Sequence, residues 1–128
     1  MKKADQKAAD KLASVDEVMI AIGEARDAAE EAFNNFAKTA QRTKDGFIAD
    51  TCGGAYVYAC KPSYAFRVAM LSAGAIEKGS GGKWQIGRFQ SVGNEQSVTA
   101  AEVACKAALR VLVARFPDET LYMNSYVS

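Results

Sequence analysis

The chain has no histidine, and this absence removes several kinds of active site. Without an imidazole there is no Ser–His or Cys–His nucleophile pair, no histidine metal ligand and no side chain that shuttles protons near neutral pH. Acidic residues are also sparse in the middle of the chain, where positions 46–98 hold only Asp50, Glu77 and Glu95. That is too few for a typical Mg²⁺ site or glycosidase carboxylate pair. The sequence therefore predicts no catalytic residue, no metal site and no cofactor, with catalysis by a less familiar arrangement as the alternative.

Several other signatures are missing. No GxxxxGK[ST] loop occurs, and the glycine-rich "GSGGK" at 79–83 precedes an expected strand, which predicts a hairpin loop rather than a phosphate cradle. No apolar run approaches the roughly 20 residues that span a bilayer, and no apolar core follows the N-terminal lysines. We therefore expect no membrane association and a cytoplasmic location, with the three cysteines (Cys52, Cys60 and Cys105) as reduced, buried thiols.

The composition is that of an ordinary globular domain. The 128 residues are 49% hydrophobic and 24% charged, which predicts a single domain over 1–128. Residues 1–13 either extend the first helix or fray from it. The formal net charge of +1 provides no overall field to hold a polyanion, which argues against nucleic acid as a partner.

The first half of the chain has helical periodicity. "SVDE" at 14–17 matches a capping box, in which a serine hydroxyl and a glutamate three residues later satisfy the free N–H groups of a helix start. Apolar residues then recur at spacings of three and four. They are Val18, Ile22, Ala25, Ala29, Phe33 and Phe36. This pattern predicts a long helix from about Ser14 to Thr43.

From Gly46 the period shortens to that of strands. Tyr56, Tyr58 and Cys60 alternate with Ala55, Val57 and Ala59, and Phe66, Val68 and Met70 alternate with Ala65, Arg67 and Ala69. Four runs rich in aromatic and β-branched residues follow one another through turn-forming segments: "FIADTC" (47–52), "AYVYACK" (55–61), "YAFRVAML" (64–71) and "KWQIGRF" (83–89). Short connections favour an antiparallel meander. A helix is the alternative for the third run, because Ala, Met and Leu favour helices, but we predict a strand there.

A second helix and a short tail complete the predicted domain. "TAAE" at 99–102 is a second capping box, the apolar pattern behind it is helical as far as Phe116, and Pro117 ends the helix. The tail after Pro117 is apolar enough to pair as a strand or to pack on a partner subunit. Since neither helix buries its apolar stripe alone, we expect both on the sheet. The predicted fold is α+β: an antiparallel sheet of four or more strands, a long N-terminal helix, a second helix packed on the sheet, and a C-terminal strand or tail.

The chemistry that is present suits binding. Arg67, Lys83 and Arg88 lie in predicted strands, and Arg110 and Arg115 lie in the second helix. Guanidinium groups hold phosphates through two parallel hydrogen bonds, and aromatic rings stack on bases. The aromatic residues of the strand region are Tyr56, Tyr58, Tyr64, Phe66, Trp84 and Phe89, for which a place in the core is the competing interpretation.

Two finer expectations concern the loop at 91–97 and the helix arginines. Asn94 and Gln96 in "SVGNEQS" offer amide groups next to a helix N-terminus, whose dipole favours anions, although such a loop can also be a simple solvated connection. Arg110 and Arg115 are five residues apart and so lie on different helix faces. We expect Arg110, between Leu109 and Val111, to be the more constrained of the two.

A long capped helix, a compact antiparallel sheet and then "SVTAAEVACKAALRVLVARFPD" (97–118) resemble small phage α–β–α sandwich proteins. Length and element order are also similar to the Thoeris anti-defence sponges, phage proteins that hold cyclic ADP-ribose-type immune signals without cleaving them. The resemblance implies a homo-oligomer in which bases stack on aromatic rings and arginines hold the phosphates. The positions here that could fill these parts are Arg67, Trp84, Asn94 and Arg110.

The sequence and the resemblance together predict a non-enzymatic phage immune-evasion protein. It would sequester a cyclic nucleotide signal in the host cell cytoplasm. The alternatives are an anti-CRISPR-like inhibitor that occupies the surface of a host defence complex, and a small nucleic-acid-binding domain.

Overall fold

A computed structural model describes residues 15–46, 48–50, 52–79, 81–87, 89 and 97–127. Its elements are the helices α2 (Val15–Thr39), α3 (Tyr64–Ser72) and α4 (Val98–Arg115), and the strands β1 (Gly53–Cys60), β2 (Ile76–Lys78), β3 (Lys83–Ile86) and β4 (Leu121–Val127). The strands form one antiparallel sheet in the order β2-β3-β1-β4. The predicted α+β class, with a long first helix, a second helix on the sheet and a C-terminal strand, is confirmed.

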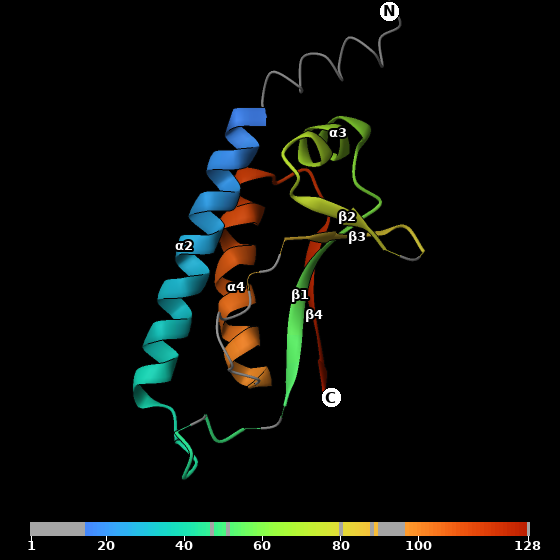
Figure 1. Cartoon of the computed structure of the whole chain (residues 1–128). Helices are drawn as coiled ribbons and strands as arrows, with labels where there is room; N and C mark the ends of the chain where they lie inside the picture. Colours follow the sequence, from blue (N-terminus) through green and yellow to red (C-terminus); the bar gives the residue numbers. More distant parts are fainter. Residues whose placement is uncertain are drawn as a thin grey trace, which may run out of the picture.

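The long helices form two successive layers on one side of the sheet (Figure 1). α4 packs directly on β1 and β4, whereas α2 packs on α4. The expectation that both helices lie on the sheet was wrong. The reason is that α4 has apolar side chains on two sides and can serve as a central layer. Its buried residues are Ala100, Ala101, Ala104, Cys105, Ala108 and Leu112.

α2 follows its predicted apolar stripe but ends earlier than expected. Its buried residues, Val18, Ala21, Ile22, Ala25 and Ala29, keep the spacing of three and four. The helix ends at Thr39 rather than Thr43, and the Arg42 guanidinium turns back to donate a 3.1 Å hydrogen bond to the Ala37 carbonyl. A cationic donor at a helix C-terminus satisfies a carbonyl that has no partner within the helix. The predicted cap at Ser14 lies outside the described residues.

The third predicted strand is a helix. α3 begins after Pro62 and Ser63, and the Ser63 hydroxyl accepts a 3.3 Å hydrogen bond from the Phe66 backbone N–H. Phe66, Ala69 and Met70 are buried at helical spacing. The alternation seen in the sequence placed Phe66 and Met70 on one face of a strand, but positions four apart share one face of a helix equally well. The N-cap and the high helix propensity of Ala, Met and Leu decide for the helix.

The described residues of the first predicted strand (47–52) do not form a strand, whereas the tail and the "SAGAIEKGSGG" segment do. Among the described residues of this run, 48–50 and 52, only isolated bridges form, Arg42↔Ile48 and Cys52↔Ser97. The carboxylate of Asp50 explains the interruption, because it accepts hydrogen bonds from the Ser97 hydroxyl (2.6 Å) and the Thr99 backbone N–H (2.8 Å). It therefore stabilises the start of α4. The N-cap of α4 is Ser97 rather than the predicted Thr99, with the Ser97 hydroxyl accepting from Ala100.

The two faces of the sheet differ in composition. The predicted alternation in β1 is confirmed: Ala55, Val57 and Ala59 are fully buried under the helices, while Tyr56 and Tyr58 lie on the other face, half-buried. The register of the ladders extends this division to β3 and β4. The helix-facing side also holds Trp84, Ile86, Leu121 and Met123, and we call it the covered face. The opposite side also holds Gln85, Tyr122, Asn124 and Tyr126, and we call it the open face.

Candidate functional site

Arg67 of α3 joins two of the aromatic residues in the sequence-based proposal. Its guanidinium carbon lies 5.6 Å from the ring centroid of Tyr64 and 5.6 Å from that of Trp84. These are cation–π contacts, worth about 0.5–1 kcal/mol each at exposed sites. Tyr64 is 54% exposed, and Arg67 and Trp84 are half-buried. We call these three residues the Arg67 cluster.

Local structure explains why these groups meet. The Ser63 cap and the main-chain hydrogen bond from Arg67 N–H to the Ser63 carbonyl (2.9 Å) fix the first turn of α3, which carries both Tyr64 and Arg67. Trp84 is in β3, where the pairing of Ala59 with Trp84 places its ring on the covered face beside α3. The α3 start and the β2–β3 hairpin are therefore brought together by tertiary packing alone, across some twenty residues of sequence.

Charges of both signs lie near the cluster. The Ser63 backbone N–H, one residue before Tyr64, donates a 2.9 Å hydrogen bond to the Glu119 carboxylate. Lys78 is the cross-strand partner of Trp84 and so shares its face of the sheet. Lys61 follows β1, and its N–H donates to the Gly82 carbonyl in the hairpin at 3.0 Å. Within the described residues no carboxylate pairs with Arg67, whose contacts are the two rings. Its N–H donors are therefore available to an anionic ligand.

The two arginines of α4 behave differently from expectation. Arg115 forms a two-point ion pair with Glu24 of α2, with contacts of 3.1 Å (Nε to Oε2) and 2.5 Å (a terminal nitrogen to Oε1). Arg110 is exposed, and it is two positions from both Ala108 and Leu112, which face the interior. Since helix positions two apart point in opposite directions, Arg110 points outward. Arg115 is thus the constrained arginine, and the described structure gives Arg110 no contact with the Arg67 cluster.

The remaining predicted site residue, Asn94, lies outside the described residues, as do Arg88 and Gln96. The sequence also predicted an anion site where the 91–97 loop meets the N-terminus of α4. The described residues show which groups occupy the donors there. The Asp50 carboxylate already accepts the Thr99 N–H there and the Ser97 hydroxyl bonds to Ala100, so the protein's own groups use these first-turn donors.

Among the hollows lined by described residues, three differ in charge, and two of them are mainly acidic. The largest of these three, about 410 Å³, lies between α2, α3 and the end of α4 and includes Phe66 and Phe116 with Glu17, Asp118 and Glu119. Its one cation, Arg115, is paired with Glu24. A smaller hollow of about 180 Å³ lies between α2 and the end of α3, beside Ile22, Arg26 and Gly74.

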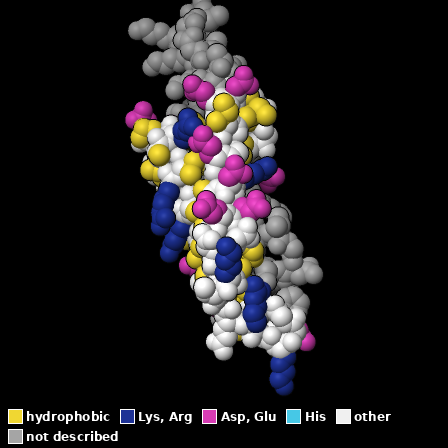
Figure 2. Space-filling view, turned by 90° about the vertical axis from the view of Figure 1, so that its left-hand side faces the viewer, with side chains coloured by type: hydrophobic (Ala, Val, Ile, Leu, Met, Phe, Trp, Pro, Cys, Tyr) yellow, Lys and Arg dark blue, Asp and Glu magenta, His cyan; other side chains and the backbone are white. Residues whose placement is uncertain are grey.

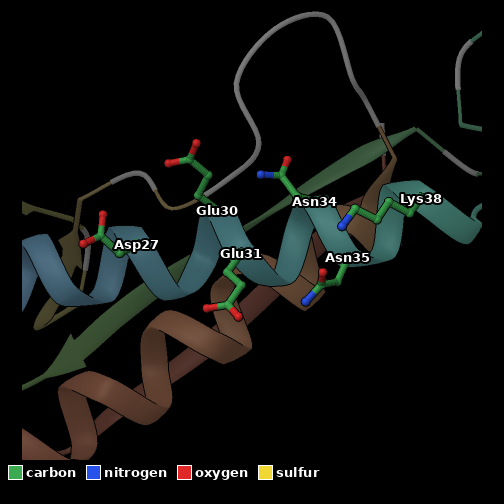
Figure 3. Close-up of a pocket in the computed structure, with 6 residues that line it drawn as sticks. All are labelled: Asp27, Glu30, Glu31, Asn34, Asn35 and Lys38. Atoms are coloured by element: carbon green, nitrogen blue, oxygen red, sulfur yellow. The ribbon is translucent and has the colours of Figure 1, made fainter.

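The third hollow, about 340 Å³, runs along α2 only. Its lining residues, Asp27, Glu30, Glu31, Asn34, Asn35 and Lys38, all come from this one helix, and Figure 3 shows their side chains diverging from it. Figure 2 shows the α2 side of the molecule, where acidic side chains lie in the upper and middle part and basic ones lie among them and below. α2 has six acidic and two basic residues, so an anionic ligand is disfavoured on this side and favoured at the Arg67 cluster.

The open face holds aromatic residues that the sequence-based site did not include. The rings of Tyr56 and Tyr126 stack with centroids 5.7 Å apart, and those of Tyr58 and Tyr122 stack at 5.6 Å. Gly54 lies beneath Tyr126, since a Cβ there would approach its ring to 2.9 Å. Tyr122, Asn124 and Tyr126 alternate in "LYMNSYV" (121–127), a period-two signal that could have predicted this face once the tail was taken as a strand.

The cysteines and the search for metal groups add no further chemistry. Cys105 is buried and donates a 3.4 Å hydrogen bond to the Ala55 carbonyl, and burial raises the pKa of its thiol to about 12. Cys52 is exposed and Cys60 half-buried, so the expectation that all three are buried holds only for Cys105. The described part of the chain contains no group of three or more His, Cys, Asp or Glu residues that could hold a metal ion. None of its helices is long and apolar enough to cross a membrane.

The chain was compared with known protein families, curated proteins and solved structures. No family model matches it, and neither a curated protein nor a solved structure is significantly similar to it.

Proposed function

We propose that this protein binds a cyclic nucleotide of the cyclic ADP-ribose type at the Arg67 cluster and sequesters it without cleaving it. The observation that carries the proposal is the Arg67 guanidinium, held between two aromatic rings and unpaired with any described carboxylate. Rings that stack on a base and a guanidinium that grips phosphate are the two parts such a ligand requires.

The roles within the cluster follow from exposure and charge. Tyr64 has the more accessible ring and is suited to stack on the base. Arg67 donates to the phosphate oxygens, and Lys78, beside Trp84, adds a second positive charge on the same face of the sheet. Trp84 holds the guanidinium in place, which reduces the conformational entropy that Arg67 would lose on binding. In this scheme Arg110 and Asn94 remain predictions from the resemblance.

In this proposal the protein holds the cyclic nucleotide and does not cleave it. The chain has no histidine to act as a general base, and burial raises the pKa of the Cys105 thiol, which disfavours its nucleophilic thiolate form. A protein of this kind would act by lowering the free concentration of a signal. Its biological role would be that of a phage immune-evasion protein in the infected cell.

The test is a thermal-shift titration with cyclic ADP-ribose and other cyclic nucleotides. A ligand at 100 times its dissociation constant stabilises the folded state by about 2.7 kcal/mol, which is readily measured as a rise in Tm. Denaturing the complex by heat should return the unaltered ligand. A linear or hydrolysed product would instead make the protein an enzyme.

Variants locate the site. Arg67→Ala removes one or two charge-assisted hydrogen bonds and should weaken binding roughly tenfold to a hundredfold. Arg26→Ala, which removes the same charge from the acidic α2 side, is the matched control and should leave binding unchanged. Arg110→Ala belongs in the same series: if Arg110 holds a phosphate, as the resemblance implies, this variant should weaken binding by tens-fold or more. No binding to any cyclic nucleotide, together with tight binding to a host protein, would favour the inhibitor alternative.

A further inference from the structure

The two edges of the sheet differ in how well they are protected from pairing with another strand. The β2 edge is three residues long and carries Glu77 and Lys78. The β4 edge is seven residues long, Leu121–Val127, with no charged residue and no proline. Proteins usually protect exposed edges with short strands, charges, prolines or bulges. β4 has none of these and pairs with β1 without interruption over its whole length.

The backbone of β4 has a defined set of outward-facing groups. The Cys60 N–H donates to the Thr120 carbonyl at 2.9 Å, which identifies Cys60 and Thr120 as a hydrogen-bonded pair of the β1–β4 ladder. Hydrogen-bonded and non-hydrogen-bonded pairs alternate in an antiparallel ladder. The backbone groups of Tyr122, Asn124 and Tyr126 therefore face β1. Those of Leu121, Met123, Ser125 and Val127 face away from the sheet, where no described element pairs with them.

We propose that β4 pairs antiparallel with β4 of a second copy of this chain, around a two-fold axis at Asn124. The four outward residues are spaced symmetrically about Asn124. A register centred there pairs Leu121 with Val127 of the partner subunit and Met123 with Ser125 of the partner subunit. Each pair exchanges two hydrogen bonds, about eight over the interface. Registers centred on other residues of the strand leave one or more outward groups unpaired.

The side chains in this register are complementary to themselves. On the open face Tyr122 lies opposite Tyr126 of the partner subunit, and Asn124 lies opposite Asn124 of the partner subunit. Aromatic cross-strand pairs are stabilising, and amide groups can hydrogen-bond to each other across the axis. No like charges meet, because β4 has no charges. The two tyrosine stacks of each chain become one continuous aromatic face across an eight-stranded sheet.

A second copy fits this edge better than an unrelated protein for the same reason. An uncharged strand offers no electrostatic feature by which a foreign partner would be selected. Antiparallel pairing of identical strands about a two-fold axis satisfies both edges at once and closes the assembly. The inference does not depend on the proposed ligand, since β4 is at one edge of the sheet and Trp84 is in β3, on the far side of β1.

Sedimentation equilibrium of the unmodified chain at micromolar concentration is the first measurement. We expect twice the 13.7 kDa mass of one chain. Asn124→Lys places two like charges opposite each other at the axis and should give the single-chain mass. Gln85→Lys is the matched control, because it adds the same charge to the open face in β3, away from the edge, and should leave the dimer intact. Circular dichroism verifies that both variants are folded.

Cysteine cross-linking tests the register directly. In a chain with Cys52 and Cys60 replaced by serine, Asn124→Cys places two thiols at a non-hydrogen-bonded pair, about 4.5 Å apart at Cα, within the range of a disulfide. Ser125→Cys pairs with Met123 of the partner subunit, so its own copy lies too far away. Mild oxidation should cross-link Asn124→Cys at least roughly tenfold faster than Ser125→Cys. A single-chain mass for the unmodified protein, a dimer that persists in Asn124→Lys, or equal cross-linking of the two cysteine variants would each overturn the proposal.

Discussion

The covered and open faces of the sheet use opposite kinds of side chain. On the covered face β1 presents Ala55, Val57 and Ala59, each 0% exposed, to an α4 surface that is itself mostly alanine. On the open face the same strand presents tyrosines, which stack on those of β4. Small residues let the helix approach the sheet closely, whereas half-buried tyrosines keep a polar group in water over an apolar ring. The core therefore depends on the close approach of α4 to the sheet. The tyrosine rings of the open face remain available for contact with another molecule.

The largest loss of stability is expected from a substitution at Ile86. This residue is 0% exposed on the covered face, and its neighbour Gln85 lies on the open face of the same strand. Ile86→Ala should lower the free energy of unfolding by about 2–5 kcal/mol through lost burial and a cavity. Gln85→Ala should change it by less than about 0.5 kcal/mol. Urea denaturation measures both, and similar losses would mean that the two faces do not differ in burial as described.

Enlarging a buried side chain of α4 tests how closely this helix packs against its neighbouring layers. Ala104 is 0% exposed between layers, and Ala114 is exposed on the same helix. Ala104→Leu should destabilise the fold by about 1–3 kcal/mol, since close-packed interiors accept extra methylene groups poorly. Ala114→Leu makes the same change on the surface and should be nearly neutral. A neutral Ala104→Leu would show that space exists between α4 and its neighbours.

Burial of Cys105 predicts a pH dependence of stability. Burial raises its pKa from 9.0 in the unfolded chain to about 12 in the folded one. The stability associated with this shift is fully present below pH 9 and is lost as pH rises from 9 towards 12, because the unfolded state releases its proton first. The slope is about 1.4 kcal/mol per pH unit in this window. It should disappear in Cys105→Ala, and an unchanged slope there would assign the effect to other groups.

The same burial predicts a difference in thiol reactivity. Cys52 is exposed and should react with a thiol reagent in the native state, whereas Cys105 should react only after unfolding. Native-state labelling followed by mass spectrometry separates the two sites. Rapid labelling of Cys105 in the native protein would contradict its place between α4 and β1.

The tyrosine stacks are expected to give the smallest effect. A double-mutant cycle with Tyr58→Phe as a ring-preserving control, and Tyr58→Ala and Tyr122→Ala as the deletions, should give a coupling energy of about 0.5–1.5 kcal/mol. Tyr58→Phe should keep most of it, because the stack depends on the ring. No coupling would mean that the rings are neighbours without a favourable contact.

Local signals in the sequence were sufficient to predict much of the fold. The stripe from Val18 to Ala29, the helix that Pro117 ends and the alternation from Ala55 to Cys60 are short-range patterns, and the structure confirms each of them. The absence of histidine and the presence of Arg67 and Trp84 could also be read directly. These features depend on the residues within one or two turns of the chain, which is why they could be predicted.

Tertiary structure decided the rest. Tyr64–Leu71 fits both periods, and the Ser63 cap and packing of Phe66 and Met70 selected the helix. The tail is a strand because it pairs with β1. In the described part of 47–52, Asp50 instead accepts a hydrogen bond from Ser97 at the start of α4. The Arg67 cluster and the unprotected β4 edge exist because segments distant in the chain were brought together. Periodicity can indicate a strand, as it does in 121–127, but it does not indicate which segments pair, because the energy of pairing comes from contacts that form only when the whole domain has folded.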